Sequence, residues 1–97
     1  MKMNYGYLRD SAGKVDTQRE SFDGVVSSMQ SIINELQSEW EGNAANEFAG
    51  QFDRLKNSAF KEITQLFVDL AKQLRDSAEI MEKAENDIAG VFKAGAN

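Results

Sequence analysis

The sequence contains no cysteine and no histidine in 97 residues. Without cysteine the chain can form no disulfide bond and no thiolate metal site. Without histidine it lacks the commonest general base and the commonest metal ligand. Because a chain this short buries a low fraction of its surface, we expect it to gain stability by associating with another chain.

A basic surface and a long apolar stretch are also missing. The formal net charge of −5 argues against nucleic acid and against anionic membrane surfaces, which both attract basic proteins. No apolar run approaches the length of a transmembrane helix, so we expect no stable membrane insertion. The first ten residues contain an early lysine but no apolar core, unlike a conventional signal peptide. Composition alone therefore predicts a cytosolic protein.

Proline is absent as well, so nothing in the sequence forces a helix to break. Apolar residues recur at alternating intervals of three and four, which predicts amphipathic helices with a repeat near the coiled-coil value. The first series, with Arg19 in its one missing place, comprises Leu8, Ala12, Val15, Phe22, Val26, Met29, Ile33, Leu36 and Trp40. The second series, with Ser77 or Ala78 at its gap, comprises Phe48, Phe52, Leu55, Ala59, Ile63, Leu66, Leu70, Leu74, Met81, Ala84, Ile88 and Val91.

The two series are separated by the segment Trp40-Glu41-Gly42. Gly42 suits the position that follows a helix, where a positive φ costs glycine little, and Asn43 suits the N-cap of the next helix. A short connection makes the two helices antiparallel neighbours, so the predicted fold is an all-α hairpin forming a single domain over residues 1–97. The predicted boundaries are helix one about 5–40, turn 41–43, helix two about 44–89 and a flexible tail over 90–97.

Several apolar residues lie off the two main series. They are spaced seven apart on each helix: Val25 and Ile32 on the first, Phe60 and Phe67 on the second. An apolar stripe this wide exceeds what one partner helix requires. We interpret the excess as an interface for a second hairpin, which would give a four-helix bundle by two-fold dimerisation. The alternative is that these residues widen the seam within one chain.

Acidic residues outnumber basic ones, 16 against 11, and several of them crowd the end of the second helix. Paired carboxylates act in catalysis or bind Ca²⁺ only where they converge in a cleft or in a loop of set spacing. The acidic residues here instead lie along a regular helix, which predicts a solvated acidic face. They are Asp76, Glu79, Glu82, Glu85 and Asp87. No nucleophile motif, phosphate-binding glycine loop or metal-ligand spacing is present. We therefore expect no enzymatic activity, no cofactor and no metal.

The helix–turn–helix pattern around the Trp-x-Gly turn resembles the WXG family, the early-secreted-antigenic-target-like substrates of bacterial type VII secretion. The resemblance covers nearly the whole chain. It is carried at the turn by Trp40, Gly42, Ala44, Phe48 and Phe52. The resemblance implies a protein that is made and folded in the cytoplasm and then exported without a classical signal peptide. This expectation differs from the cytosolic location that the composition alone predicts.

A second family mark is a C-terminal export signal that alternates hydrophobic and acidic positions. Met81, Glu85, Ile88 and Phe92 match that spacing, although any amphipathic helix generates it readily. The related Tyr-x-x-x-[DE] form is absent, because Tyr5 and Tyr7 lie at the opposite end of the chain. Its absence resembles the self-pairing members from Firmicutes, which favours a homodimer over a pair with a homologous hairpin.

The resemblance thus implies a secreted effector or co-substrate, virulence-associated in Gram-positive bacteria, that acts by protein–protein contact. Its expected partners are a second copy of itself and the type VII secretion ATPase. The alternative is a cytosolic chaperone for a larger toxin with a similar N-terminal hairpin. Membrane lysis is disfavoured, because helices that lie on membranes usually carry basic polar faces.

Overall fold

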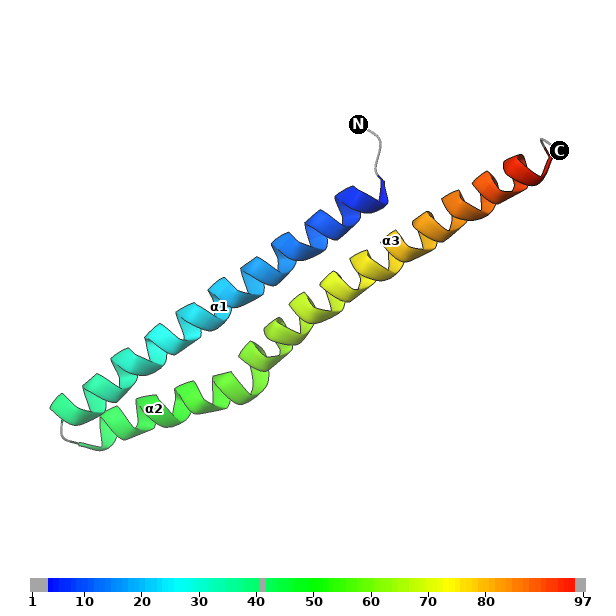
Figure 1. Ribbon diagram of the computed structural model, residues 1–97. Helices are drawn as coiled ribbons and strands as arrows, with labels where there is room; N and C mark the ends of the chain where they lie inside the picture. The colour runs from blue at the N-terminus through cyan, green and yellow to red at the C-terminus, as the bar shows by residue number, and fades with distance from the viewer. Residues whose placement is uncertain (1–3, 41, 96–97) are drawn as a thin grey trace.

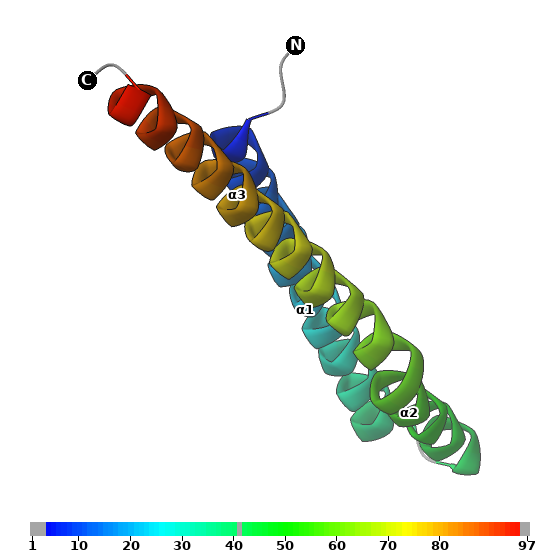
Figure 2. The ribbon, with the colours of Figure 1, turned by 90° about the vertical axis from the view of Figure 1, so that its right-hand side faces the viewer.

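The protein folds as an antiparallel helical hairpin, as the sequence predicts (Figure 1). The structure, a computed structural model, describes residues 4–40 and 42–95. Helix α1 (Tyr5–Glu39) forms the first arm. The second arm comprises α2 (Asn43–Leu55), the π-helical turn η1 (Lys56–Phe60) and α3 (Lys61–Gly95). The molecule is a rod of 82 × 19 × 18 Å, and both views place the start of α1 and the end of α3 at the end opposite the turn (Figure 2).

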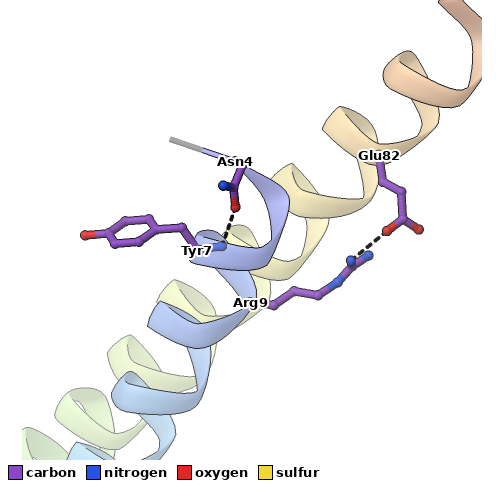
Figure 3. A network of polar contacts seen from close by, with 4 residues as sticks. All are labelled: Asn4, Tyr7, Arg9 and Glu82. Carbon is purple, nitrogen blue, oxygen red and sulfur yellow. Dashed lines mark hydrogen bonds and ion pairs between the residues drawn. The ribbon is translucent and has the colours of Figure 1, made fainter. Parts of the chain in front are cut away.

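Helix α1 begins with a side-chain cap. Asn4 has extended backbone angles, and its Oδ1 accepts a hydrogen bond of 2.8 Å from the backbone N–H of Tyr7 (Figure 3). This bond satisfies one of the backbone donors that a helix leaves free at its start. The helix ends where Trp40 adopts extended angles while its N–H still bonds to the carbonyl of Leu36.

The turn depends on glycine, but its position relative to the helices differs from the prediction. Gly42 has φ +139° and ψ 168°, a region that is essentially restricted to glycine. It is the N-cap of α2, whereas Asn43, predicted to be the cap, is the first helical residue and makes no capping bond. The reason is that the chain already leaves the helical conformation at Trp40, so the reversal is complete by Gly42.

The arms meet along a narrow seam of buried residues. These are Leu8, Ala12 and Ile33 in α1, and Ala45, Phe52, Ala71 and Ala78 in the second arm. In the middle of the seam the ring of Phe22 packs against those of Phe60 and Phe67, with centroids 5.9 and 6.2 Å apart. Phe60 also packs against Phe52 at 5.8 Å. Aromatic pairs at these distances add to the stabilisation from burial.

The predicted stripe on helix two is wrong at Ile63, Leu66 and Leu70, which are exposed, whereas Ala78 is buried as predicted. Leu66, predicted to face α1, is 66% exposed, and Phe67 occupies the seam in its place. The cause is η1, because a π-helical turn inserts one extra residue into the helix. Every position after the turn is therefore rotated by about 100° relative to an uninterrupted α-helix. The arm also bends visibly where α2 meets α3 (Figure 1).

The second arm stays helical to Gly95, beyond the predicted end near residue 89. Gly90 alone does not stop the helix, because one internal glycine costs only about 1 kcal/mol relative to alanine. No proline follows to block further helical turns. Figure 1 shows that the end of α3 extends past the first residue of α1.

The rod has two different long faces. One of these faces carries the polar side chains that connect the two arms, and we call it the polar face. Most of these side chains stand three residues before or four residues after a buried seam residue. Four polar contacts cross between the arms there within the described residues. They are Arg9–Glu82 at 2.7 Å, Asp16–Arg75 at 2.6 Å, Gln30–Lys56 at 2.9 Å and Gln37–Asn46 at 3.3 Å.

We call the opposite side the apolar face. It carries large apolar side chains that stand four residues before, one residue before or three residues after a seam residue. Around Ile33 in α1 these are Met29, Ile32 and Leu36, and around Phe67 in α3 they are Ile63, Leu66 and Leu70. Val25, Phe48 and Leu55 extend the same face. All of these side chains are exposed in the single chain.

Candidate partner-binding face and C-terminal segment

The apolar face contains a groove near the turn. It has a volume of about 330 Å³ and lies between α1 and α2. The buried side chains of Ile33 and Phe52 form its floor. Its remaining lining is Met29, Ile32, Leu36, Phe48, Gln51 and Leu55. An exposed apolar groove of this kind is typical of a site where another protein binds.

The structure divides the four residues that the sequence indicates as a dimer interface. Val25 and Ile32 lie on the apolar face and are each 57% exposed. Phe60 and Phe67 are half-buried in the seam against Phe22. Within one chain, therefore, the two phenylalanines connect the arms, whereas Val25 and Ile32 remain available to a partner. Their role in an interface stays a prediction.

The sequence pattern assigned several residues of this face to the seam instead. Five members of the predicted second series are exposed: Phe48, Leu55, Ile63, Leu66 and Leu70. Past residue 56, only knowledge of the π turn could have identified them, because an uninterrupted helix would turn them inward. The exposed set is therefore larger and more continuous than the sequence indicates.

The turn residues lie at the tip of the rod. Trp40 is 49% exposed and Phe48 is 56% exposed. Phe52, one helical turn after Phe48, is buried in the seam. The Trp-Glu-Gly corner therefore presents an indole ring and a phenyl ring to its surroundings, next to the apolar groove. Glu41 lies outside the described residues.

The predicted export residues lie along one side of the final turns of α3. Met81, Glu85, Ile88 and Phe92 follow one another at steps of four, three and four, and all four are exposed, Phe92 to 75%. The first of them adjoins Glu82, whose Oε2 accepts a hydrogen bond from Arg9 Nη1 (Figure 3). Beyond this ion pair α3 runs past the start of α1 (Figure 1). The segment is thus helical, and most of it projects from the hairpin.

Electrostatic effects in the described region come from exposed ion pairs. The hydrogen bond that Arg9 donates to Glu82 raises the pKa of Arg9, and the one that Asp16 accepts from Arg75 lowers the pKa of Asp16. Lys72 pairs with Asp76 one helical turn away, which raises the pKa of the lysine. Across residues 4–40 and 42–95, no group of three or more acidic side chains is arranged to hold a metal ion. These charges act between the arms and along α3.

Within residues 4–40 and 42–95, no helix is both long enough and apolar enough to cross a membrane.

The structure thus defines a class of protein: an elongated helical hairpin with a Trp-x-Gly tip, an apolar face and a projecting C-terminal helix. A family model described as WXG100, proteins of 100 residues with WXG, matches residues 1–86. The chain belongs to the WXG100 family. It is accordingly a small protein associated with type VII secretion.

Individual relatives resemble the chain over most of its length. YukE of Bacillus subtilis is 32% identical over 86 residues, which cover 89% of this chain and 88% of that protein. The ESAT-6-like protein SAG1039 of Streptococcus agalactiae is 30% identical over 92 residues and 92% of each chain. The structure of Geobacillus thermodenitrificans EsxA, crystal form I, matches with a TM-score of 0.79 at 23% identity. That match covers 94% of this chain and 99% of EsxA, and it supports the hairpin fold.

Proposed function

We propose that two copies of the chain pair through their apolar faces into a four-helix bundle, and that the pair is exported by a type VII secretion system. The apolar face supports the pairing, because it runs along both arms and leaves Ile32, Leu66 and other large side chains in water. Burying such side chains is favourable by roughly 1.5–3 kcal/mol each. In a two-fold symmetric pair, the apolar face of one copy packs against the same face of the other copy.

The observation that carries the export proposal is the projection of α3 beyond α1. Ile88 and Phe92 are exposed there on a regular helix, with Glu85 between Met81 and Ile88 on the same side. A secretion ATPase would recognise this segment by burying the apolar side chains and pairing with the carboxylate of Glu85. In this proposal the exported protein acts by contact with other proteins, as an effector or as a co-substrate.

Immunoblotting of culture supernatant tests the proposal, with and without the membrane ATPase of the secretion system. We expect the protein in the supernatant only when the ATPase is present. Glu85→Ala should reduce export and leave the helical content and the oligomeric mass unchanged. Asp87→Ala is the matched control, because it removes the same charge from the same exposed helix outside the predicted spacing. Export that continues unchanged without the ATPase would contradict the proposal.

The alternative function, a cytosolic chaperone for a larger toxin, uses the same apolar face against a foreign hairpin. Affinity purification of the chain from its own cells separates the two proposals. A larger chain recovered in equal amount would support the chaperone. Recovery of a pair of identical chains, together with protein in the supernatant, would support the exported dimer.

A further inference from the structure

The π-helical turn η1 interrupts the second arm near its middle. Before it, the seam positions Ala45 and Phe52 are seven residues apart. The next seam position, Phe60, comes eight residues later, and Phe67 follows after seven more. The turn therefore absorbs one extra residue and keeps the aromatic side chains directed at α1. Such turns often mark functional sites in helices.

The sequence contains a second set of residues suited to the seam. If η1 became regular α-helix, α3 would rotate by about 100° about its axis. Each seam residue after the turn would then be replaced by the residue before it: Phe60 by Ala59, Phe67 by Leu66, Ala71 by Leu70 and Ala78 by Ser77. From Phe52 this second set follows at steps of seven, seven, four and seven, without the eight-residue step that η1 introduces. The chain thus encodes two registers for α3 against α1.

The two registers present different surfaces. In the π register Leu66 and Leu70 belong to the apolar face, and Arg75 and Glu82 reach Asp16 and Arg9. In the α register the two leucines would turn onto α1, and both ion pairs would separate. Leu70 in place of Ala71 would also widen the seam at that level. Each register therefore gains contacts that the other loses.

We propose that η1 is a register switch that couples the pairing of two chains to a rotation of α3. This inference rests on the proposed pairing through the apolar face. A second copy contacts Leu66 and Leu70 only in the π register, so pairing selects that register from the two that the free chain samples. When the pair separates, η1 becomes regular α-helix in part of the population, and the apolar face loses those leucines to the seam.

Engineered cysteines can read out the register, because the chain has none of its own. Ala12 and Ala78 are both fully buried, and the ion pairs Arg9–Glu82 and Asp16–Arg75 place them at the same level of the rod. Ala12→Cys with Ala78→Cys therefore reports the π register. Ala12→Cys with Ser77→Cys reports the α register. Intramolecular disulfide formation is followed on gels over a dilution series, with the mass measured by light scattering at each concentration.

At concentrations where the mass is that of two chains, we expect the 12–78 disulfide and loss of the 12–77 disulfide. At concentrations where the mass is that of one chain, both should form. A chain with Ser58 deleted is the control, because removing one residue lets Ala78 face Ala12 through an uninterrupted α-helix. In that background the 12–77 disulfide should be absent at every concentration, and helical content measured by circular dichroism should be retained.

The outcomes separate this inference from the proposed pairing. A mass of two chains with the 12–77 disulfide absent throughout would overturn the switch and leave the pairing intact. A mass of one chain at every concentration would overturn the pairing, and with it the coupling. Both disulfides in a ratio that does not change on dilution would likewise overturn the coupling, and formation of neither would overturn the two registers.

Discussion

Arg75 of α3 donates a hydrogen bond of 2.6 Å from Nη2 to Oδ2 of Asp16 in α1, although the two residues are 59 positions apart in the sequence. The pair joins the two arms on the polar face, next to the buried Ala12 and Ala78. Both side chains are partly exposed, so the pair contributes modestly to stability and mainly sets how the arms align.

The Asp16–Arg75 pair predicts a specific loss of stability in acid. Arg75 lowers the pKa of Asp16 in the folded protein, so folding favours the ionised carboxylate. The resulting stabilisation is fully present above the unfolded-state pKa of about 3.9 and is lost as the pH falls through the lower folded-state pKa. Thermal melts between pH 7 and pH 2 should show a smaller acid-induced decrease in Tm for Asp16→Asn than for the unmodified chain. Asp10→Asn, an exposed carboxylate on the same helix, should leave the decrease unchanged. Identical profiles for both variants would contradict this role of Asp16.

The buried Phe52 and the exposed Phe48 lie one helical turn apart in α2, and their truncation should have different effects. Phe52→Ala should lower the free energy of unfolding by about 3 kcal/mol at any protein concentration, because it leaves a cavity in the seam. Phe48→Ala should destabilise the protein only where pairs form, so its effect on denaturant unfolding should increase with protein concentration. Equal, concentration-independent losses would show that Phe48 is buried within one chain.

A charge on the apolar face should separate the proposed pair. We expect Leu66→Glu to yield a mass of one chain by light scattering with helical content retained, because a carboxylate buried between two copies would lack a partner. Val68→Glu is the matched control. Val68 is also an exposed apolar residue of α3, but it lies beside Asp16 and Arg75 on the polar face. If both variants keep the mass of the unmodified protein, or both lose it, the apolar face is not the interface.

Replacing glycine should have opposite effects at two positions. At Gly42 the positive φ disfavours any side chain, and alanine should cost roughly 1–3 kcal/mol of stability although no atom lies near its Cβ. At Gly24, in the interior of α1 and equally open, alanine should add about 0.5–1 kcal/mol, because it lowers the entropy of the unfolded chain. Chemical denaturation measures both changes. A neutral or stabilising Gly42→Ala would show that the turn adopts another conformation in solution.

The sequence predicts the two arms well, because their apolar repeats are long and no proline interrupts them. It locates the turn at Trp40 to Gly42 for the same reason. It misplaces the cap by one residue, since the residue at which a helix leaves its regular angles depends on local geometry and not on periodicity. Glycine at the reversal was predictable, because few other residues adopt a positive φ.

The apolar face beyond residue 56 could not be predicted. One extra residue in a long amphipathic helix leaves the spacing of three and four nearly unchanged, and Ile63, Leu66 and Leu70 continue the earlier series without a visible break. The choice between that series and the one containing Phe60 and Phe67 depends on packing against Phe22 of the other arm. Such a contact, about 40 residues away in the sequence, leaves no mark in a local pattern.

The contacts between the arms also imply an order in which the hairpin forms. Gln37 and Asn46 are nine residues apart, Lys56 and Gln30 are 26 apart, and Arg9 and Glu82 are 73 apart. The entropy lost in closing a loop rises with its length, and each pair formed shortens the loop that the next pair must close. Folding should therefore begin at the turn and proceed stepwise along the arms, so that the start of α1 and the facing part of α3 come together last.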